Sequence, residues 1–157
     1  MIYVFDDSSL SNILNHYYTD RFPSFWEKFN EIVSQKKLIS VREVRNELTG
    51  KFDDDKIEIM MKHNRDFFTN PSTEELSFIT EIYSVKHFQQ NLERKKLWSG
   101  GYFADPFVIA KAWAVKGTVV TEEEYKEHGA KIPNICKHFD IPCLKLEGFL
   151  KEVDWKF

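Results

Sequence analysis

Four acidic residues in this sequence stand where an apolar segment begins or ends. Asp6 follows IYVF, Glu47 lies in VREVRNEL, Asp105 opens DPFVIAKA and Glu123 comes shortly after GTVVT. Carboxylate oxygens are the hard ligands that Mg²⁺ and Mn²⁺ prefer in proteins. A cation held in this way polarises a phosphoryl oxygen and lowers the pKa of its bound water. If folding gathers the four carboxylates, the pattern predicts metal-dependent chemistry on phosphate esters.

Each of these acids also has an ordinary structural interpretation. Asp105 precedes a proline and could cap a helix, and Asp6 with Asp7 could cap the first helix. Glu47 could be a solvated helix charge. Glu123 lies in a run of three glutamates, and most such runs face solvent. The prediction of a site therefore depends on the joint placement of the four acids.

The elements that would position these acids follow an alternating order. Short apolar runs predict strands, and amphipathic segments between them predict helices, which together indicate an α/β fold with a parallel sheet. We expect one domain, 1–157, with three α/β/α layers around four to five strands. The segment 52–98 is predicted to be an all-helical insertion or cap within that domain. The predicted strands are 2–5, 38–40, 118–121 and 143–146.

The carboxyl ends of parallel strands are where open α/β sheets bind ligands. Asp6 lies at the end of the first predicted strand and Glu123 lies just past the third. Glu47 is on the helix after the second strand, and Asp105 opens the helix that leads into the third. All four acids can therefore reach one edge of the sheet.

The composition limits the remaining possibilities. The chain has 157 residues, a formal net charge of -3 and two cysteines. Binding of a polyanion therefore requires a local basic patch or a bound cation. Two cysteines are too few for a disulfide scaffold, and no signal peptide or membrane span is visible, so we expect a cytoplasmic protein without membrane association. Zinc-type histidine spacing and nucleotide-binding glycine motifs are absent from the sequence.

The order and spacing of the motifs resemble the PIN-domain nuclease superfamily, in particular a short prokaryotic PIN-like family. The resemblance covers roughly residues 1–50 and 100–146. Two departures stand out: Asp7 replaces a common Thr, and Glu123 replaces a common Asp, with Glu122 as a rival for the fourth acid. The matching motifs are IYVFDDSSL, Val44 to Leu48 (VRNEL), Ala104 to Ala112 (ADPFVIAKA) and Val119 to Thr121 followed by Glu123.

The resemblance implies a Mg²⁺- or Mn²⁺-dependent endoribonuclease that hydrolyses RNA phosphodiester bonds. Asp6 and Asp105 would be the main metal ligands, and Glu47 a ligand or a water-orienting base. Glu123 would be an outer or second-site ligand. Ser8 and Thr121 would hold Asp6 by hydrogen bonds. Without metal, at least one of the crowded acids should have a raised pKa.

Basic and aromatic residues beside these motifs are candidates for contacts with RNA. Phosphate contacts are predicted near Glu47 and in the loop before Asp105, and two aromatic residues of that loop could stack on bases. Lys131, in the KIP sequence, matches a landmark of the PIN-like family. The candidate contact residues are Arg42, Arg45, Lys51, Arg94, Lys95, Lys96, Trp98 and Tyr102.

The size and family likeness also suggest a toxin of a prokaryotic toxin–antitoxin pair, with an antitoxin protein as partner and a possible homodimer. One alternative is a PIN-like binding or regulatory module with a weak or absent active site. Another is a haloacid-dehalogenase-like phosphatase. That class needs a second Asp two residues after the first, where this chain has Ser8.

Overall fold

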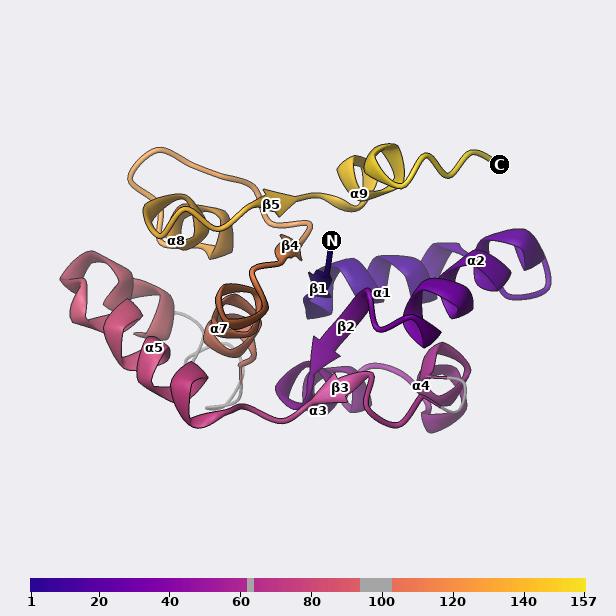
Figure 1. The fold of residues 1–157 in the computed structure, drawn as a ribbon, viewed down its shortest axis with the longest axis horizontal. Helices are drawn as coiled ribbons and strands as arrows, with labels where there is room; N and C mark the ends of the chain where they lie inside the picture. The colour runs from indigo at the N-terminus through magenta and orange to yellow at the C-terminus, as the bar shows by residue number, and fades with distance from the viewer. Residues whose placement is uncertain (62–63, 94–102) are drawn as a thin grey trace.

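The centre of the fold is a sheet of five parallel strands in the order β3-β2-β1-β4-β5 (Figure 1). The computed structural model describes residues 1–61, 64–93 and 103–157. The α/β class with a central parallel sheet, predicted from the alternating pattern, is confirmed. The strands are β1 (Tyr3–Phe5), β2 (Leu38–Val41), β3 (Phe68–Thr69), β4 (Thr118–Val120) and β5 (Cys143–Leu144).

Helices cover both faces of this sheet, giving three layers. In Figure 1, α5, α7 and α8 lie on one side of the sheet, and α1, α2 and α9 lie on the other. Among the described residues, no helix is long and apolar enough to cross a membrane. The helices are α1 (Asp7–His16), α2 (Pro23–Ser34), α3 (Arg42–Thr49), α4 (Asp54–Met61), α5 (Thr73–Ser84), the 3₁₀ helix η1 (Lys86–Phe88), α7 (Asp105–Val115), α8 (Ile132–His138) and α9 (Leu146–Glu152).

The two central strands explain why the acids that follow them are buried. All residues of β1 and β4 are buried, as expected for strands covered on both faces. Helix α7 packs against β1, β2 and β4, so its first residues lie near the ends of these strands. Gly117, just before β4, allows a close approach, because a Cβ there would lie 2.5 Å from the carbonyl oxygen of Ile2.

The prediction that 52–98 is all helical is wrong. Helix α4 ends at Met61, and Phe68–Thr69 form strand β3, which pairs with β2 and so extends the sheet. The backbone N–H of Ser40 donates to Phe67 at 2.9 Å, and the Phe67 ring is buried. Burial against the edge of the sheet overrides the local helical pattern here, because tertiary packing outweighs weak propensities.

The helical part of this segment is also interrupted after Ser84. Helix α5 begins with a capping box, in which the side chains of Ser72 and Glu75 each accept the backbone N–H of the other. Helix α5 ends at Ser84, because Val85 takes an extended conformation before η1. Residues 89–93 are helical again. This break turns the chain so that Asn91 reaches the start of α7.

Candidate functional site

Asp6 lies directly after β1, with its carboxylate buried among hydroxyl groups. The Ser8 hydroxyl lies 2.9 Å from both carboxylate oxygens, and the Thr121 hydroxyl donates to Oδ2 at 2.5 Å. Ser9 adds its backbone N–H at 2.9 Å and its hydroxyl at 3.0 Å, both to Oδ1. The hydrogen bonds expected from Ser8 and Thr121 are therefore present. Asp6 also caps α1, so the structural and the functional interpretations apply to the same side chain.

The second group of acids lies where α1, α3 and α7 meet. The carboxyl group of Glu47 hydrogen-bonds to Asp7 and accepts the backbone N–H of Ala104. The negative charge of Asp105 also acts on Glu47. Lys51 pairs with Asp7 at 2.6 Å. Three carboxyl groups from distant parts of the sequence therefore lie close together, with one cation at their edge.

Asp105 is the first residue of α7 and does not cap it. The N-cap is Ala104, which makes no side-chain capping bond. The carboxylate of Asp105 instead accepts a hydrogen bond from the side-chain amide of Asn91 at 3.1 Å. The Asn91 amide oxygen in turn accepts the hydroxyl of Tyr83 at 2.9 Å. This buried chain of hydrogen bonds fixes the direction of Asp105, and burial together with the charge of Asp105 raises the pKa of Tyr83.

Glu122 and Glu123 diverge after β4. The Glu122 carboxylate accepts the backbone N–H of Leu146 at 2.8 Å, at the start of α9. The Glu123 carboxylate accepts the N–H of Ile132 at 3.0 Å, at the start of α8. Glu123 also raises the pKa of Asp6 by its charge, so it is the glutamate on the Asp6 side. Lys131 is the N-cap residue of α8, so the KIP sequence presents the N–H of Ile132 to Glu123.

The pKa values of two of these carboxyl groups are raised. Burial raises the pKa of Asp6 to about 7, against the hydrogen bonds from Thr121, Ser9 and Ser8, which lower it. Burial also raises the pKa of Glu47, to about 9, with further contributions from Asp7 and Asp105. Burial and the neighbouring carboxyl groups therefore favour the protonated form of Glu47. The ionised forms are destabilised because burial removes water and neighbouring charges repel.

The two groups of acids face a common region. A hydrogen bond with Cys143 and burial raise the pKa of the Cys136 thiol, and the charges of Glu123 and Asp105 add to this effect. Cys136 lies on α8, fully buried. One acid of each group, Glu123 and Asp105, therefore acts by its charge on the same buried thiol.

The acids fit a hard divalent cation by chemistry, because they offer only oxygen ligands and carry crowded negative charge. They are arranged as a pair, Asp6 with Glu123, and a trio of Asp7, Glu47 and Asp105. Within the ranges that the structure describes, no group of three or more His, Cys, Asp or Glu side chains has the geometry of a metal site. Metal ligation by Asp6, Glu47, Asp105 and Glu123 stays a prediction.

Comparison with known proteins gives one match. A family model described as "Domain of unknown function (DUF4411)" covers residues 3–157. The chain belongs to the DUF4411 family. No curated protein and no solved structure matches it. The likeness to PIN-domain nucleases stays a prediction based on the motifs.

The structure describes only some of the predicted RNA-contact residues of this DUF4411 protein. Arg42 pairs with Glu43 at 2.8 Å and Arg45 with Glu58 at 3.5 Å, both on the surface. These arginines lie on α3, the helix that carries Glu47. Lys51 pairs with Asp7. The remaining candidates, Arg94, Lys95, Lys96, Trp98 and Tyr102, lie outside the described residues.

Several residues of the DUF4411 site escaped the sequence analysis as site residues. Ser9 is not among the site residues that the motifs predict, and Asp7 is predicted only as a possible cap of the first helix. Asn91 and Tyr83 lie in the segment that matched no motif. A weak signal existed for Asn91, because an amide on an otherwise apolar helical face needs a buried partner. Its partner, Asp105, could not be named without the fold.

Proposed function

We propose that this protein is a Mg²⁺- or Mn²⁺-dependent endoribonuclease with a PIN-like active site. The observation that carries the proposal is the gathering of carboxyl groups beyond the carboxyl ends of β1, β2 and β4. Natural proteins seldom bury several carboxyl groups close together without a functional reason. The raised pKa values of Asp6 and Glu47, which come chiefly from burial, support the proposal, since a bound cation would favour the ionised carboxylates.

The side chains have distinct roles in this proposal. Asp6 and Asp105 would hold the cation, each fixed by neutral hydrogen-bond donors. A bound cation would supply Lewis-acid activation of the scissile phosphate and of the attacking water. Burial raises the pKa of Glu47 without metal, and a bound cation would lower it, so that the ionised carboxylate could then act as a base towards water. Glu123 would complete the site from the β4 side.

RNA, a protein antitoxin and a cytoplasmic location belong to the same proposal. The support for RNA and for a toxin–antitoxin role is the motif likeness and the size of the chain. A homodimer would be a common arrangement for such a protein.

A second candidate is a binding module with a PIN-like fold and a weak active site. One observation favours it: the carboxylates of Glu47 and Glu123 already accept the backbone N–H groups of Ala104 and Ile132. A carboxylate that accepts such a bond with one oxygen can still bind a metal ion with its other oxygen. The two candidates therefore differ in whether the acids bind a cation and support hydrolysis.

The decisive experiment measures Mn²⁺ binding by titration calorimetry and cleavage of an end-labelled single-stranded RNA. It compares wild type with the double variant Asp6→Asn plus Asp105→Asn. We expect Mn²⁺-dependent cleavage by wild type and a loss of at least roughly 100-fold in the variant. A matched control, Asp20→Asn plus Glu27→Gln, removes two exposed acids away from the site and should cleave normally. Equal Mn²⁺ binding by wild type and the double variant would refute the proposal that the protein is a metal-dependent nuclease.

The same protein samples also distinguish the proposed nuclease from the phosphatase alternative. Hydrolysis of a small phosphomonoester, without cleavage of RNA, would indicate the haloacid-dehalogenase class and contradict the proposal. Mn²⁺ binding with neither activity would favour the binding module.

A further inference from the structure

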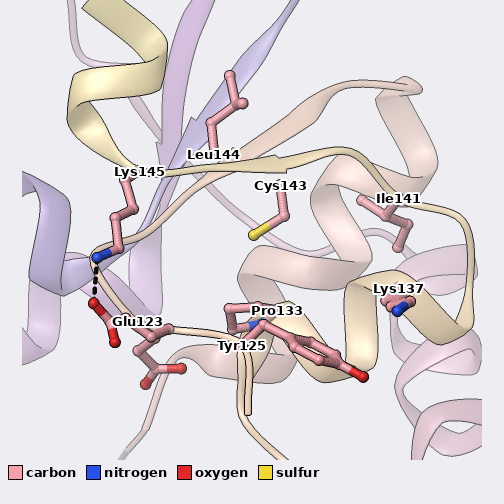
Figure 2. A pocket seen from close by; sticks show the side chains of 9 residues that line it. Glu123, Tyr125, Pro133, Lys137, Ile141, Cys143, Leu144 and Lys145 are labelled. Carbon is pink, nitrogen blue, oxygen red and sulfur yellow. Dashed lines mark hydrogen bonds and ion pairs between the residues drawn. The ribbon is translucent and has the colours of Figure 1, made fainter. Parts of the chain in front are cut away.

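A pocket of about 610 Å³ opens beside Glu123, between the segment that follows β4, helix α8 and strand β5. We call it the Tyr125 pocket. Figure 2 shows its side chains arranged around one hollow, with Tyr125 and Pro133 on one side and Cys143 and Ile141 on another. Its volume falls within the roughly 300–1,000 Å³ of small-ligand sites. It lies past the carboxyl end of β4 and beside the edge strand β5, and ligands of parallel sheets bind near the carboxyl ends of strands.

The lining combines an aromatic ring, apolar walls, two ammonium groups and the carboxylates of Glu123 and Glu124. Tyr125 is 50% exposed, so its ring is available to a ligand. Pro133 and Ile141 supply apolar surface. Lys137 and Lys145 supply positive charge at its edge. This mixture fits an amphipathic ligand with a flat apolar part and an anionic part.

The two lysines differ in the partners of their ammonium groups. Lys145 pairs with Glu124 at 2.6 Å, as the dashed line in Figure 2 shows. The ammonium of Lys137 lies 4.7 Å from the centre of the Tyr125 ring. Among the described residues, no carboxylate lies within ion-pair distance of Lys137. Its charge is therefore available to a phosphate, and its contact with Tyr125 holds the ring and the charge together.

The pocket shares a wall with the acidic site. Glu123 lines the pocket and also acts by its charge on the buried Asp6 carboxylate. A single-stranded nucleic acid that crosses the acidic site can therefore continue along the surface into the pocket. Flat bases stack on aromatic rings in single-stranded nucleic-acid binders, and lysines contact the phosphates.

From this arrangement we infer that the Tyr125 pocket binds one nucleotide of single-stranded RNA next to the scissile phosphate, with its base against Tyr125 and a phosphate near Lys137. The inference rests on the proposed nuclease function. It assigns the substrate contact to the β4–α8 side of the site. It also explains why the exposed Tyr125 ring and the Lys137 ammonium lie together beside the acids.

The test measures binding of end-labelled single-stranded oligouridylate by fluorescence anisotropy at low ionic strength in EDTA. All variants are made in the Asp6→Asn plus Asp105→Asn background, which removes two repelling charges and should not cleave. Tyr125→Ala and Lys137→Ala should each weaken binding at least five-fold, which is the lower end of the effect of one base stack, about 1 kcal/mol. Tyr18→Ala and Lys28→Ala are matched controls on exposed residues away from the pocket and should change binding less than two-fold.

The inference is overturned if the four variants bind RNA equally, or if the background protein does not bind the oligonucleotide. Its failure can be told apart from failure of the nuclease. If wild type cleaves RNA but the pocket variants bind normally, only the pocket assignment is wrong. If wild type does not cleave RNA but the pocket variants lose binding, the pocket stands and the catalytic proposal falls.

Discussion

Neutralising Asp6 should stabilise the metal-free protein, although it removes the group on which the proposed activity depends. The folded-state pKa of Asp6 is raised from 3.8 to about 7, chiefly by burial. The folded protein therefore binds a proton at this group more tightly than the unfolded chain does. The stability that comes from this proton is therefore fully present below pH 3.8 and is lost as the pH rises towards about 7.

The size of the effect follows from the two pKa values. At 1.36 kcal/mol per pKa unit, the difference between 3.8 and about 7 corresponds to at most about 4 kcal/mol above pH 7. Asn is as good an N-cap as Asp, so the bond from the Ser9 N–H to the side chain is kept. We expect Asp6→Asn to stabilise the protein by about 2–4 kcal/mol at pH 8. For a chain of this length this raises Tm by about 4–16 °C.

The assay is thermal unfolding in EDTA at pH 8 and at pH 4. The gain from Asp6→Asn should be less than about 1 kcal/mol at pH 4, because most Asp6 side chains are then protonated in the folded protein and many in the unfolded chain. Adding Mn²⁺ should raise the Tm of wild type more than that of the variant, because binding to the folded state stabilises it.

Asp7 provides the matched control with the opposite sign. Burial would raise the pKa of Asp7, but hydrogen bonds with Glu47, Lys51 and Ser11 outweigh it and lower the pKa. Ionised Asp7 thus stabilises the fold above its unfolded pKa, and this stability is lost as pH falls through the folded pKa. Asp7→Asn should lower Tm at pH 8. The reasoning is refuted if Asp6→Asn lowers Tm at pH 8 as Asp7→Asn does.

Two further predictions concern the supports of α7. Asn91→Leu should destabilise the protein by about 2–4 kcal/mol in urea unfolding, because Asp105 loses a buried donor and the Tyr83 hydroxyl loses its acceptor; an unchanged midpoint would contradict the hydrogen-bond chain. Lys111→Met should cost about 3–5 kcal/mol in the same assay, since it leaves the buried Glu75 carboxylate, 3.0 Å from Lys111, without its cation. A cost below about 1 kcal/mol would mean that water reaches this pair.

The sequence alone determined the class of fold and most of its elements. Period and composition decide whether a segment becomes a buried strand or an amphipathic helix, and this information is local. The capping box at Ser72 and the buried strand before Asp6 are examples. The resemblance of the motifs to PIN-domain nucleases also implied that Ser8 and Thr121 hold Asp6 by hydrogen bonds, and both bonds are present.

Only the tertiary structure decided how the acids are paired and what supports them. Strand β3 forms because the two neighbouring phenylalanines gain burial at the edge of β2, which no local pattern in 52–98 reveals. Glu123 turns to α8 and Glu122 to α9, although they are neighbours in one acidic run. Asn91 meets Asp105 only because the chain breaks after α5. Contacts between distant segments depend on how whole elements pack, and burial then sets which carboxyl groups keep their protons.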